Sequence, residues 1–534
     1  MPQTPMTSPL AAFDACVEAQ PHAIALWYFN SPVTFSELDR MANALAFAWQ
    51  SSVRPADRVA ICNQNTPATV IGLLAAWRLG AAVMPLSPML TRRELIHFLM
   101  DGEPSAAIVG VEQARVFQEA MTDWGGAAQV AVTFPSDHLA GDALPQTLKN
   151  VPIQFTPQDR WTCMAELLQG HSMPVSRQTV GREAAFLTYT SGTTGVPKAA
   201  LNTHANVAFS ADVYKRWLNL GPDDVLFAAA PFSHVTGLVA HIAAAFAAQA
   251  PLVMCHRFDP GTVLDLLNER GCTTTVAAIT AYIALLEHPK FDPSRLGRFR
   301  KLFSGGAPVA PAVVERWEKA TGVYIHNAYG LTETTSPSHL VPLGRRAPVD
   351  SSTGCLSVGV PVPDTLCRIV DVQTRAPVPA GEVGELMTRG PQVVEGYWRK
   401  PEETRAAFED GWLRTGDLGR TDEDGWFYIV DRAKDVIVAS GFKIWPREIE
   451  DALLEHPALS EAAVVGVADS YRGEAPEAFV VLRAGMTVAT HELNAFCRER
   501  LAPYKVPRLF RVVESLPKTA SGKVLRRVLR ERSA

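Results

Sequence analysis

The chain lacks the features that mark several classes of protein. Its 534 residues include only eight cysteines, and no two of them stand in the close pairs that metal sites or redox motifs use. This spacing rules out a small disulfide-stabilised scaffold and fits a reducing, cytoplasmic location. With 50 Lys and Arg against 55 Asp and Glu, the formal net charge is -5. Composition therefore gives no polycationic surface for nucleic acid or an anionic membrane, and the expected partner is a small molecule.

Neither a signal peptide nor a membrane span is expected. The first twenty residues place no Lys or Arg before an apolar core and have no cleavage-like end. The stretch from Val225 to Cys255 is uncharged and long enough to raise the question of a span. Polar residues and prolines interrupt it, so we expect a buried strand, helix and strand there. The interrupting residues are Pro231, Ser233, His234, Thr236, His241, Gln249 and Pro251.

The chain is too long for one hydrophobic core, so several structural units are expected. From residue 181 onward, short β-like runs alternate with helix-like runs, which is typical of a parallel sheet with crossover helices. Helices are predicted after Asp259 and over 308–320, and 355–430 is predicted to form a small β subdomain. The predicted buried strands cover 184–189, 225–230, 251–254, 273–278, 301–305 and 323–326.

The sequence pattern changes near residue 431. The last hundred residues predict a compact βαβ-like set, with helices over 446–454 and 490–501 and strands over 461–467 and 477–483. We therefore expect two domains, 1–432 and 433–534.

The string TYTSGTTGVPK, from Thr188 to Lys198, follows a predicted strand. Hydroxyl groups, glycines and a lysine in so short a loop are what polyphosphate oxygens require. The Walker pattern is absent, and a plain Ser/Thr/Gly turn stays open as an alternative for this loop alone. The candidate phosphate-binding residues are Thr190, Ser191, Gly192, Thr193, Thr194, Gly195 and Lys198.

Five further strings follow in order: NAYGLTE (327–333), GELMTRG (384–390), GWLRTGDLG (411–419), DRAKDVIVASGFKIWPREIE (431–450) and PKTASGKVLRR (517–527). With them the chain resembles the adenylate-forming superfamily of acyl-CoA synthetases, carrier-protein adenylation domains and luciferases. The resemblance implies an α/β fold: a large N-terminal domain of parallel sheets, helices and a small β subdomain, and a small, mobile α+β C-terminal domain.

The resemblance also implies a nucleotide site. Thr332 would contact the α-phosphate of ATP, and Glu333 would help to hold Mg²⁺, which prefers carboxylate oxygens. Asp417 would accept hydrogen bonds from the ribose hydroxyls, and Arg432 would reach the ribose and phosphate side. The remaining nucleotide positions are Gly305, Gly306, Ala307, Pro308, Asn327, Ala328, Tyr329, Gly330 and Ile429.

Four further implied roles concern the reaction itself. Lys523 would stabilise the charge that develops on the α-phosphate, and Lys434 would be the hinge between the domains. A solvated lysine is the alternative for each. Gly441, Phe442 and Lys443 would serve the coenzyme A step. His234 would lie beside the acyl pocket and the approaching thiol, although a lone His is more often a core residue. The pocket would comprise His234, Val235, Gly237, Ser304, Gly305 and Ala328.

The implied function is activation of a carboxylic acid by ATP and Mg²⁺ to an acyl adenylate, followed by transfer to coenzyme A (CoA). Apolar stretches over 235–246 and 275–285 favour a monocarboxylate with an apolar acyl group. Ala277 and Ala278 stand where many relatives have prolines, which leaves the pocket's shape open. The alternatives are loading of a carrier protein, a luciferase-like oxygenase, or a non-catalytic nucleotide-binding protein. A homodimer stays open.

Overall fold

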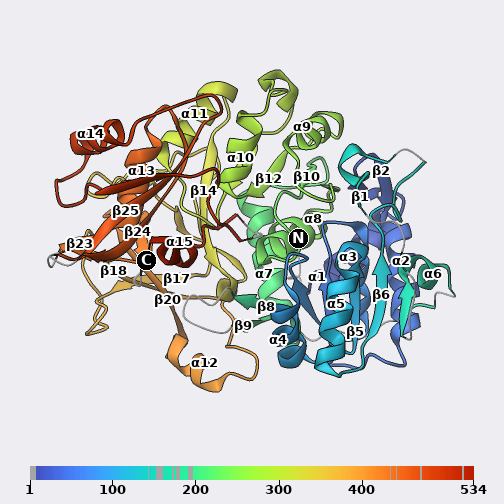
Figure 1. The fold of residues 1–534 in the computed structure, drawn as a ribbon. Helices are drawn as coiled ribbons and strands as arrows, with labels where there is room; N and C mark the ends of the chain where they lie inside the picture. The colour runs from blue at the N-terminus through green and yellow to red at the C-terminus, as the bar shows by residue number, and fades with distance from the viewer. Residues whose placement is uncertain are drawn as a thin grey trace.

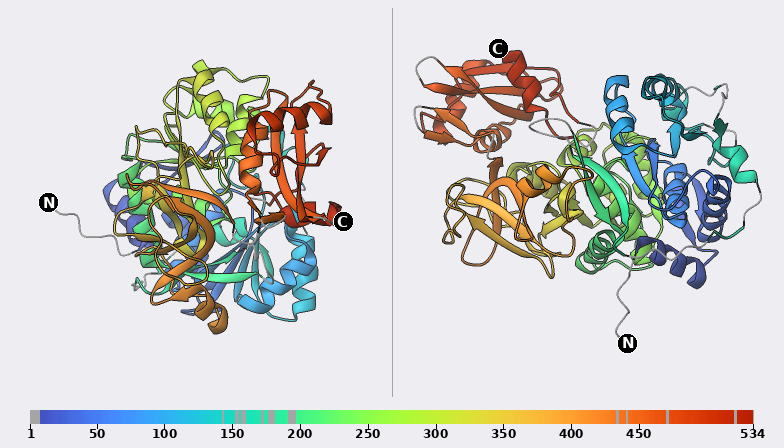
Figure 2. Two further views of the ribbon diagram at one scale, coloured as in Figure 1. Left: turned by 90° about the vertical axis from the view of Figure 1, so that its left-hand side faces the viewer. Right: turned by 90° about the horizontal axis from the view of Figure 1, so that it is seen from below.

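Four β-sheets and the helices between them form the molecule (Figure 1). The structure is a computed structural model that describes residues 8–141, 144–151, 155, 160–170, 173–175, 181–190, 197–432, 435–439, 442–469, 472–519 and 522–533. Figure 2 shows the N-terminal helices and the C-terminal segment at opposite ends of the molecule, with the middle of the chain between them.

The largest sheet has nine strands in the order β16-β15-β14-β13-β12-β10-β11-β1-β2. From β14 to β1 the neighbouring strands run parallel. Its strands are β1 (Ile24–Tyr28), β2 (Ser31–Thr34), β10 (Leu226–Phe227), β11 (Leu252–Met254), β12 (Thr274–Ala277), β13 (Lys301–Ser304), β14 (Ile325–Leu331), β15 (Ser336–Leu340) and β16 (Val360–Pro361). Ligands bind beyond the carboxyl ends of such strands, where β12, β13 and β14 carry the predicted motifs.

A second sheet has seven strands in the order β7-β6-β5-β3-β4-β8-β9. All its pairs are parallel except β8 with β9, which are the two sides of the predicted phosphate loop. Its strands are β3 (Arg58–Cys62), β4 (Ala82–Leu86), β5 (Ala106–Gly110), β6 (Gln129–Thr133), β7 (Trp161–Cys163), β8 (Ala184–Thr190) and β9 (Lys198–Thr203).

The predicted small β subdomain is present as an antiparallel sheet. Its strands are β17 (Leu366–Val370), β18 (Gly384–Arg389), β19 (Phe408–Glu409), β20 (Trp412–Thr421) and β21 (Phe427–Arg432). The fourth sheet belongs to the C-terminal segment and comprises β22 (Ile437–Ala439), β23 (Phe442–Ile444), β24 (Leu459–Asp469), β25 (Gly473–Leu482) and β26 (Leu509–Val512).

The C-terminal segment corrects one expectation. Its helices lie where the sequence predicted them, at Pro446–Leu454 and Thr490–Arg500. The predicted βαβ-like arrangement is wrong for its two long strands, because β24 and β25 pair antiparallel as neighbours. The turn between them is short, and a short connection can join only antiparallel strands. The segment has hydrophobic clusters of its own, built around residues such as Ile449, Val464 and Phe479.

Helices cover the faces of the sheets (Figure 1). They are α1 (Pro9–Ala19), α2 (Phe35–Trp49), α3 (Pro67–Arg78), α4 (Arg92–Gly102), α5 (Val111–Trp124), α6 (Met164–Gln169), α7 (His204–Trp217), α8 (Ala244–Ala248), α9 (Pro260–Glu269), α10 (Ile279–Leu286), α11 (Pro311–Thr321), α12 (Pro401–Ala407), α13 (Pro446–Leu454), α14 (Thr490–Arg500) and α15 (Arg526–Ser533). Short 3₁₀ turns and one π-helix, η2 (Gly237–Ala243), complete the set.

Local signals explain the helix that follows Asp259. The Asp259 side chain accepts a hydrogen bond from the Thr262 amide at 2.8 Å, and Pro260 occupies the first helical position. Both features favour a helix start, because the cap satisfies an amide that has no partner within the helix.

The uncharged stretch from Val225 to Cys255 is buried in the core as a strand, a π-helix continued by α8, and a second strand. Its first strand ends at Phe227, earlier than predicted, because Asn65 Nδ2 donates to the carbonyls of Ala228 and Ala230. In the described part of the chain, no helix is long and apolar enough to cross a membrane.

Buried histidines make the stability of the fold depend on pH. Burial lowers the pKa of His204 from 6.5 to about 4, and those of His241 and His339 to about 3. Below pH 6.5 the unfolded chain binds protons that the folded chain does not. Each histidine then costs about 1.4 kcal/mol of stability at pH 5.5. Asp431 and Asp451, whose pKa values burial raises to about 6 and about 7, act in the opposite direction.

We therefore expect the free energy of unfolding, measured by urea titration, to be lower at pH 5.5 than at pH 7.5 by about 1 kcal/mol. Over this range the three histidines together remove about 4 kcal/mol, and the two aspartates restore about 3 kcal/mol. An unfolding free energy that stays constant or rises between pH 7.5 and 5.5 would contradict the assignment of these side chains as neutral in the folded protein.

Candidate active site

A cavity of about 730 Å³ lies beyond the carboxyl ends of the central strands and is closed on one side by the C-terminal segment. Elements from all parts of the chain contribute to its wall, including the β8–β9 pair, the β14–β15 hairpin and the loop before α15. The predicted site residues that line it are Thr190, Lys198, His234, Val235, Gly305, Gly306, Ala328, Tyr329, Gly330, Thr332, Glu333, Arg432 and Lys523. Residues up to 333 positions apart, from Thr190 to Lys523, thus meet around one space.

The predicted phosphate loop joins β8 to β9 as a hairpin. Thr190 and Lys198 face each other as the last cross-strand pair before the loop. The tip with Ser191, Gly192, Thr193, Thr194 and Gly195 lies outside the described residues, as do Lys434 and Gly441. Of Phe442 and Lys443 the structure describes only the backbone, which belongs to β23. The roles of these residues stay predictions.

Lys198, Tyr397 and Glu333 form one cluster at the Thr190 side of the cavity. The Lys198 ammonium lies 5.5 Å from the centre of the Tyr397 ring, a cation–π contact. The Tyr397 hydroxyl donates a 2.7 Å hydrogen bond to Glu333 Oε1. Burial and the neighbouring Glu333 raise the pKa of Tyr397, so its hydroxyl keeps its proton. The cluster places one cation and one carboxylate on the same wall.

Asp417 lies behind this wall rather than on it. It is 2% exposed, and it accepts hydrogen bonds from the Tyr329 hydroxyl at 2.5 Å and, as an ion pair, from Arg432 Nε at 2.6 Å. Burial and Asp417 raise the pKa of Tyr329 well above its ordinary value. The described contacts therefore make Asp417 the group that orients two residues of the cavity wall. Its contact with a ribose stays a prediction.

Other predicted residues also lie beside the wall instead of lining it. Asn327 is 2% exposed, and its amide donates to the Ser357 carbonyl at 3.0 Å. The Ile429 carbonyl accepts from Arg447, and its side chain packs in the β subdomain next to Tyr329. Ser304, Ala307, Pro308 and Gly237 are likewise absent from the lining.

Gly330 holds the β14–β15 hairpin together by close approach. A Cβ atom at this position would lie 1.5 Å from the carbonyl oxygen of Ser336. Only glycine allows the two strands to run this close, with Leu331 and Ser336 paired across the turn. Asn202 secures the turn from β9 by donating to the Thr332 carbonyl and to Thr335 Oγ1. The positions of Thr332 and Glu333 therefore follow from backbone packing.

The loop from Thr519 to Lys523 carries Lys523 to the cavity. Thr519 Oγ1 accepts from the Lys523 amide at 3.1 Å, and the Thr519 amide donates to the Lys523 carbonyl at 2.8 Å. Gly522, with φ of +83°, packs against the connection from β12 to α10, close to Ala278 and Thr280. The C-terminal segment thus reaches the carboxyl ends of the central strands.

His234 is neutral and faces Lys523. Its Nδ1 accepts a hydrogen bond from the Thr236 amide at 3.3 Å, so the ring proton lies on Nε2. Burial, and then the charge of Lys523, lower the pKa of His234 from 6.5 to about 4. The imidazole can therefore donate a hydrogen bond to a ligand oxygen at neutral pH without adding a charge.

A second cavity, of about 540 Å³, meets the first one at His234. The two share Met89, Ser233, His234, Thr236, Gly305 and Gly306. The rest of the second cavity is lined mainly by residues 228–231, 255–258 and 277–284, with Gly522 at its edge. A ligand in the first cavity is thus accessible from a second direction.

Comparison with known proteins fits this arrangement. The AMP-binding enzyme family matches residues 13–398, and its C-terminal domain matches residues 448–523. The chain belongs to this family. A long-chain-fatty-acid–CoA ligase of Bacillus subtilis is 36% identical over 525 residues, covering 96% of this chain and 92% of the relative. A feruloyl-CoA synthase of Amycolatopsis is 33% identical, covering 96% of each chain.

Among solved structures, ATP-bound MatB from Rhodopseudomonas palustris has a TM-score of 0.85 at 29% identity, covering 98% of this chain and 99% of MatB. The apo form of MatB gives 0.76 at the same identity and covers 98% of both chains. The expected membership of the adenylate-forming superfamily, the α/β fold and the class of acid–thiol ligase are confirmed.

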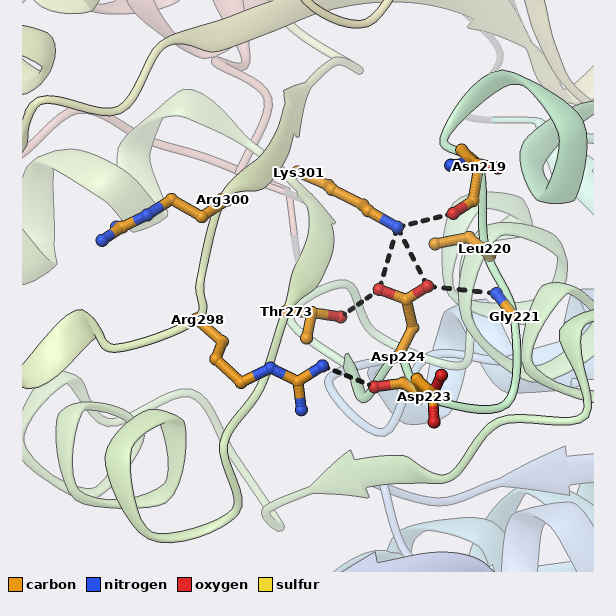
Figure 3. A pocket seen from close by; sticks show the side chains of 9 residues that line it. All are labelled: Asn219, Leu220, Gly221, Asp223, Asp224, Thr273, Arg298, Arg300 and Lys301. Atoms are coloured by element: carbon orange, nitrogen blue, oxygen red, sulfur yellow. Dashed lines mark hydrogen bonds and ion pairs between the residues drawn. The ribbon is translucent and has the colours of Figure 1, made fainter.

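A third cavity, of about 550 Å³, lies at the opposite ends of the strands. Figure 3 shows its Asp224 carboxylate surrounded by partners from the protein. Lys301 Nζ lies 2.9 Å from both carboxylate oxygens, and the Gly221 amide and the Thr273 hydroxyl donate to them as well. The charges neutralise each other and fix the starts of β10, β12 and β13.

Among the lining residues that sequence reasoning missed are Tyr397, Tyr214 and Ser336. Tyr397 stands in the string EGYWRKP, 64 residues from its partner Glu333. Tyr214 lies in α7 and bonds with Ser336, 122 residues away. Tyr397 could have been noticed as an aromatic residue between two motifs. Tyr214 could not, because in the sequence it looks like an ordinary apolar position of a helix.

Gly330→Ala is expected to displace the Ser336 strand and to weaken ATP binding by at least about tenfold, because the added Cβ has no room. Isothermal titration calorimetry with ATP measures the effect, and circular dichroism checks that the rest of the chain is folded. The control is Gly221→Ala, where a Cβ meets nothing within 4 Å. Unchanged ATP affinity in a folded Gly330→Ala enzyme would contradict the proposed hairpin geometry.

Proposed function

We propose that the enzyme converts an uncharged-tail monocarboxylic acid into its CoA thioester through an acyl adenylate, releasing pyrophosphate and then AMP. The observation that carries this proposal is that Lys523, Thr332 and His234 all line one cavity. A second cavity meets the first one at His234. One space can hold the nucleotide and the acid, and the other gives the thiol a separate route.

In the first step, a carboxylate oxygen of the acid attacks the α-phosphorus of ATP. The bond from that phosphorus to the bridging oxygen breaks, and pyrophosphate leaves with the electron pair. No protein nucleophile is needed, so the residues act by position and charge. Lys523 stabilises the negative charge on the five-coordinate phosphorus, and Thr332 contacts the α-phosphate. Lys198 at the hairpin base adds charge beside the β- and γ-phosphates.

The donor set fits a Mg²⁺ ion carried by ATP. Glu333 is the acid on the Lys198 side of the cavity, and only its Oε1 receives the Tyr397 hydroxyl. Among the described residues, no group of three or more His, Cys, Asp and Glu could hold a metal alone. Mg²⁺ usually takes one or two carboxylates together with phosphate oxygens and water, which this wall allows. Mg²⁺ would neutralise phosphate charge.

In the second step, the CoA sulfur attacks the acyl carbonyl carbon and AMP leaves with the oxygen that joined it to the acyl group. We assign the second cavity to the pantetheine arm, because it ends where the first cavity meets His234. His234 Nε2–H would donate to the acyl oxygen. In this structure Gly522 lies at the edge of the second cavity, so the loop that serves the first step partly occupies the route for the second.

We therefore propose that residues 433–534 form a separate domain that turns about Lys434 between the two steps, which brings Gly441 and its neighbours to the thiol. The TM-score is higher against ATP-bound MatB (0.85) than against apo MatB (0.76). This difference supports the proposal that the structure has the domain arrangement of the first step, in which the acyl adenylate forms. The loop position at Lys523 supports the same reading.

Two assays separate this proposal from its alternatives. Acid-dependent exchange of labelled pyrophosphate into ATP, run with aromatic, short and medium aliphatic acids, tests the first step. Complete absence of pyrophosphate exchange with every acid would contradict the proposed reaction and would favour a non-catalytic nucleotide-binding protein. AMP release with CoA, compared with release in the presence of a carrier protein, tests the second step. The second cavity favours free CoA, although the phosphopantetheine of a carrier protein would need the same channel.

Lys523→Ala is expected to reduce pyrophosphate exchange by at least about a thousandfold, because the other ammonium that lines the cavity from this stretch, Lys518, is paired with Glu461. Thioester formation from a supplied acyl adenylate should keep most of its rate. The control is Lys505→Ala, which removes an ammonium from the same segment where it pairs with Glu448. Equal loss in both half-reactions would refute the role of Lys523.

Tyr397→Phe is expected to raise the Mg²⁺ concentration for half-maximal activity about fivefold, because Glu333 loses the hydrogen bond that fixes its carboxylate. The ring that faces Lys198 stays in place. Titration of pyrophosphate exchange with Mg²⁺ measures the change. Tyr428→Phe is the matched control, since its hydroxyl bonds to Asp422 outside the cavity. An identical Mg²⁺ dependence in the two variants would disprove this positioning role.

A further inference from the structure

One part of the main cavity is apolar apart from two hydroxyl groups. Val235, Val276, Ala328 and Pro337 contribute to this part, and the two hydroxyls belong to Tyr214 and Ser336. The charged lining residues come instead from α4 (Glu94), from the phosphate hairpin, from 333 and 414–432, and from the C-terminal loop. This apolar part is where an acyl group fits once the nucleotide occupies the charged part, so the inference that follows rests on the proposed function.

The two hydroxyls are bonded to each other. Tyr214 Oη and Ser336 Oγ lie 2.9 Å apart, with residue exposures of 2% and 6%. Burial raises the pKa of Tyr214, so the phenol keeps its proton. The pair holds two hydroxyl hydrogens, and only one can lie between the two oxygens. The contacts described for these two side chains include no acceptor for the second hydrogen.

The backbone holds Ser336 in this place at a cost. Thr335 and Ser336 have φ values of +48° and +89°, a region that residues with a side chain rarely adopt. Such conformations are unfavourable and persist where the surroundings enforce them. Asn202 donates to Thr335 Oγ1, and Thr334 Oγ1 donates to the Ser336 carbonyl. The strained turn therefore fixes a hydroxyl within an otherwise apolar wall.

From this we infer that the acid has an uncharged oxygen acceptor, such as an ether, carbonyl or hydroxyl oxygen, on its acyl group, and that the Tyr214–Ser336 pair donates its second hydrogen to it. A buried donor is satisfied when a ligand supplies the acceptor. A plain hydrocarbon chain would leave the donor unpaired and displace any water bound there, which disfavours it. Tyr214 and Ser336 are then specificity-determining residues. A second carboxylate on the acid is disfavoured, because the apolar part formed with Val235, Val276, Ala328 and Pro337 contains no Lys or Arg to pair with it.

Pairs of acids that differ only by exchange of CH₂ for oxygen test this inference. The pairs are 4-methoxybenzoate with 4-ethylbenzoate, and hexanoate with its 3-, 4- and 5-oxa analogues. Pyrophosphate exchange gives kcat/KM for each acid. The wild-type enzyme is expected to prefer one oxygen-containing member over its CH₂ partner by about five- to tenfold. Tyr214→Phe leaves Ser336 as the one remaining donor and should reduce that preference, by lowering kcat/KM for the oxygen-containing acid more than for its CH₂ partner. Tyr214→Phe combined with Ser336→Ala removes both hydroxyls and should abolish the preference.

Tyr282→Phe is the matched control, because its buried hydroxyl donates to the Phe303 carbonyl and does not line the cavity. It should leave the ratio within each pair unchanged. If the CH₂ member is equal or better in every pair with the wild-type enzyme, the inference is wrong, whether or not the variant folds. Equal loss for both members in Tyr214→Phe also overturns it. If no acid supports exchange at all, the proposed function has failed instead.

Discussion

The docking of the C-terminal segment on the rest of the chain is the constraint on which the site depends. Every phosphate-facing residue from Thr190 to Arg432 belongs to the first part of the chain, whereas Lys523 arrives on a loop that packs on the β12–α10 connection. Arg447, buried at the start of α13, donates to the carbonyls of Ile429 and Val309 and so fixes the angle of approach. Without this docking, Lys523 would not reach the cavity.

The same contacts are suited to being broken. Arg483 pairs with Glu287 of α10 at 2.6 Å, but both side chains are partly exposed, and such pairs contribute about 1 kcal/mol or less. The hydrophobic clusters around Ile449 and Phe479 lie within the C-terminal segment and do not extend into the central sheets. A segment with hydrophobic clusters of its own can turn as one body, which fits two half-reactions that need different loops at one place.

How much the sequence predicted depended on the range of the interactions. Strand β8, helix α13 and the residues of the Y-G-x-T-E string were predicted because their signals lie within a dozen residues. Pairings over long distances were not: Tyr397 reaches Glu333 from 64 residues away. Motif positions alone also placed Asp417 on the wall, whereas packing puts Tyr329 and Arg432 in front of it. The end of β10 at Phe227 depends on Asn65, a side chain from the loop between β3 and α3.

The distribution of charge explains how a protein with a formal net charge of -5 can bind a polyphosphate. Among the cations that line the cavity, Lys198, Arg432 and Lys523 stand on three different elements, so the positive charge is distributed around the wall. Close to Lys523 the protein places an imidazole that burial keeps neutral. A protonated His234 would compete with Lys523 for the same oxygens and repel it. The neutral ring keeps a hydrogen-bond donor on the cavity wall without adding a charge beside Lys523.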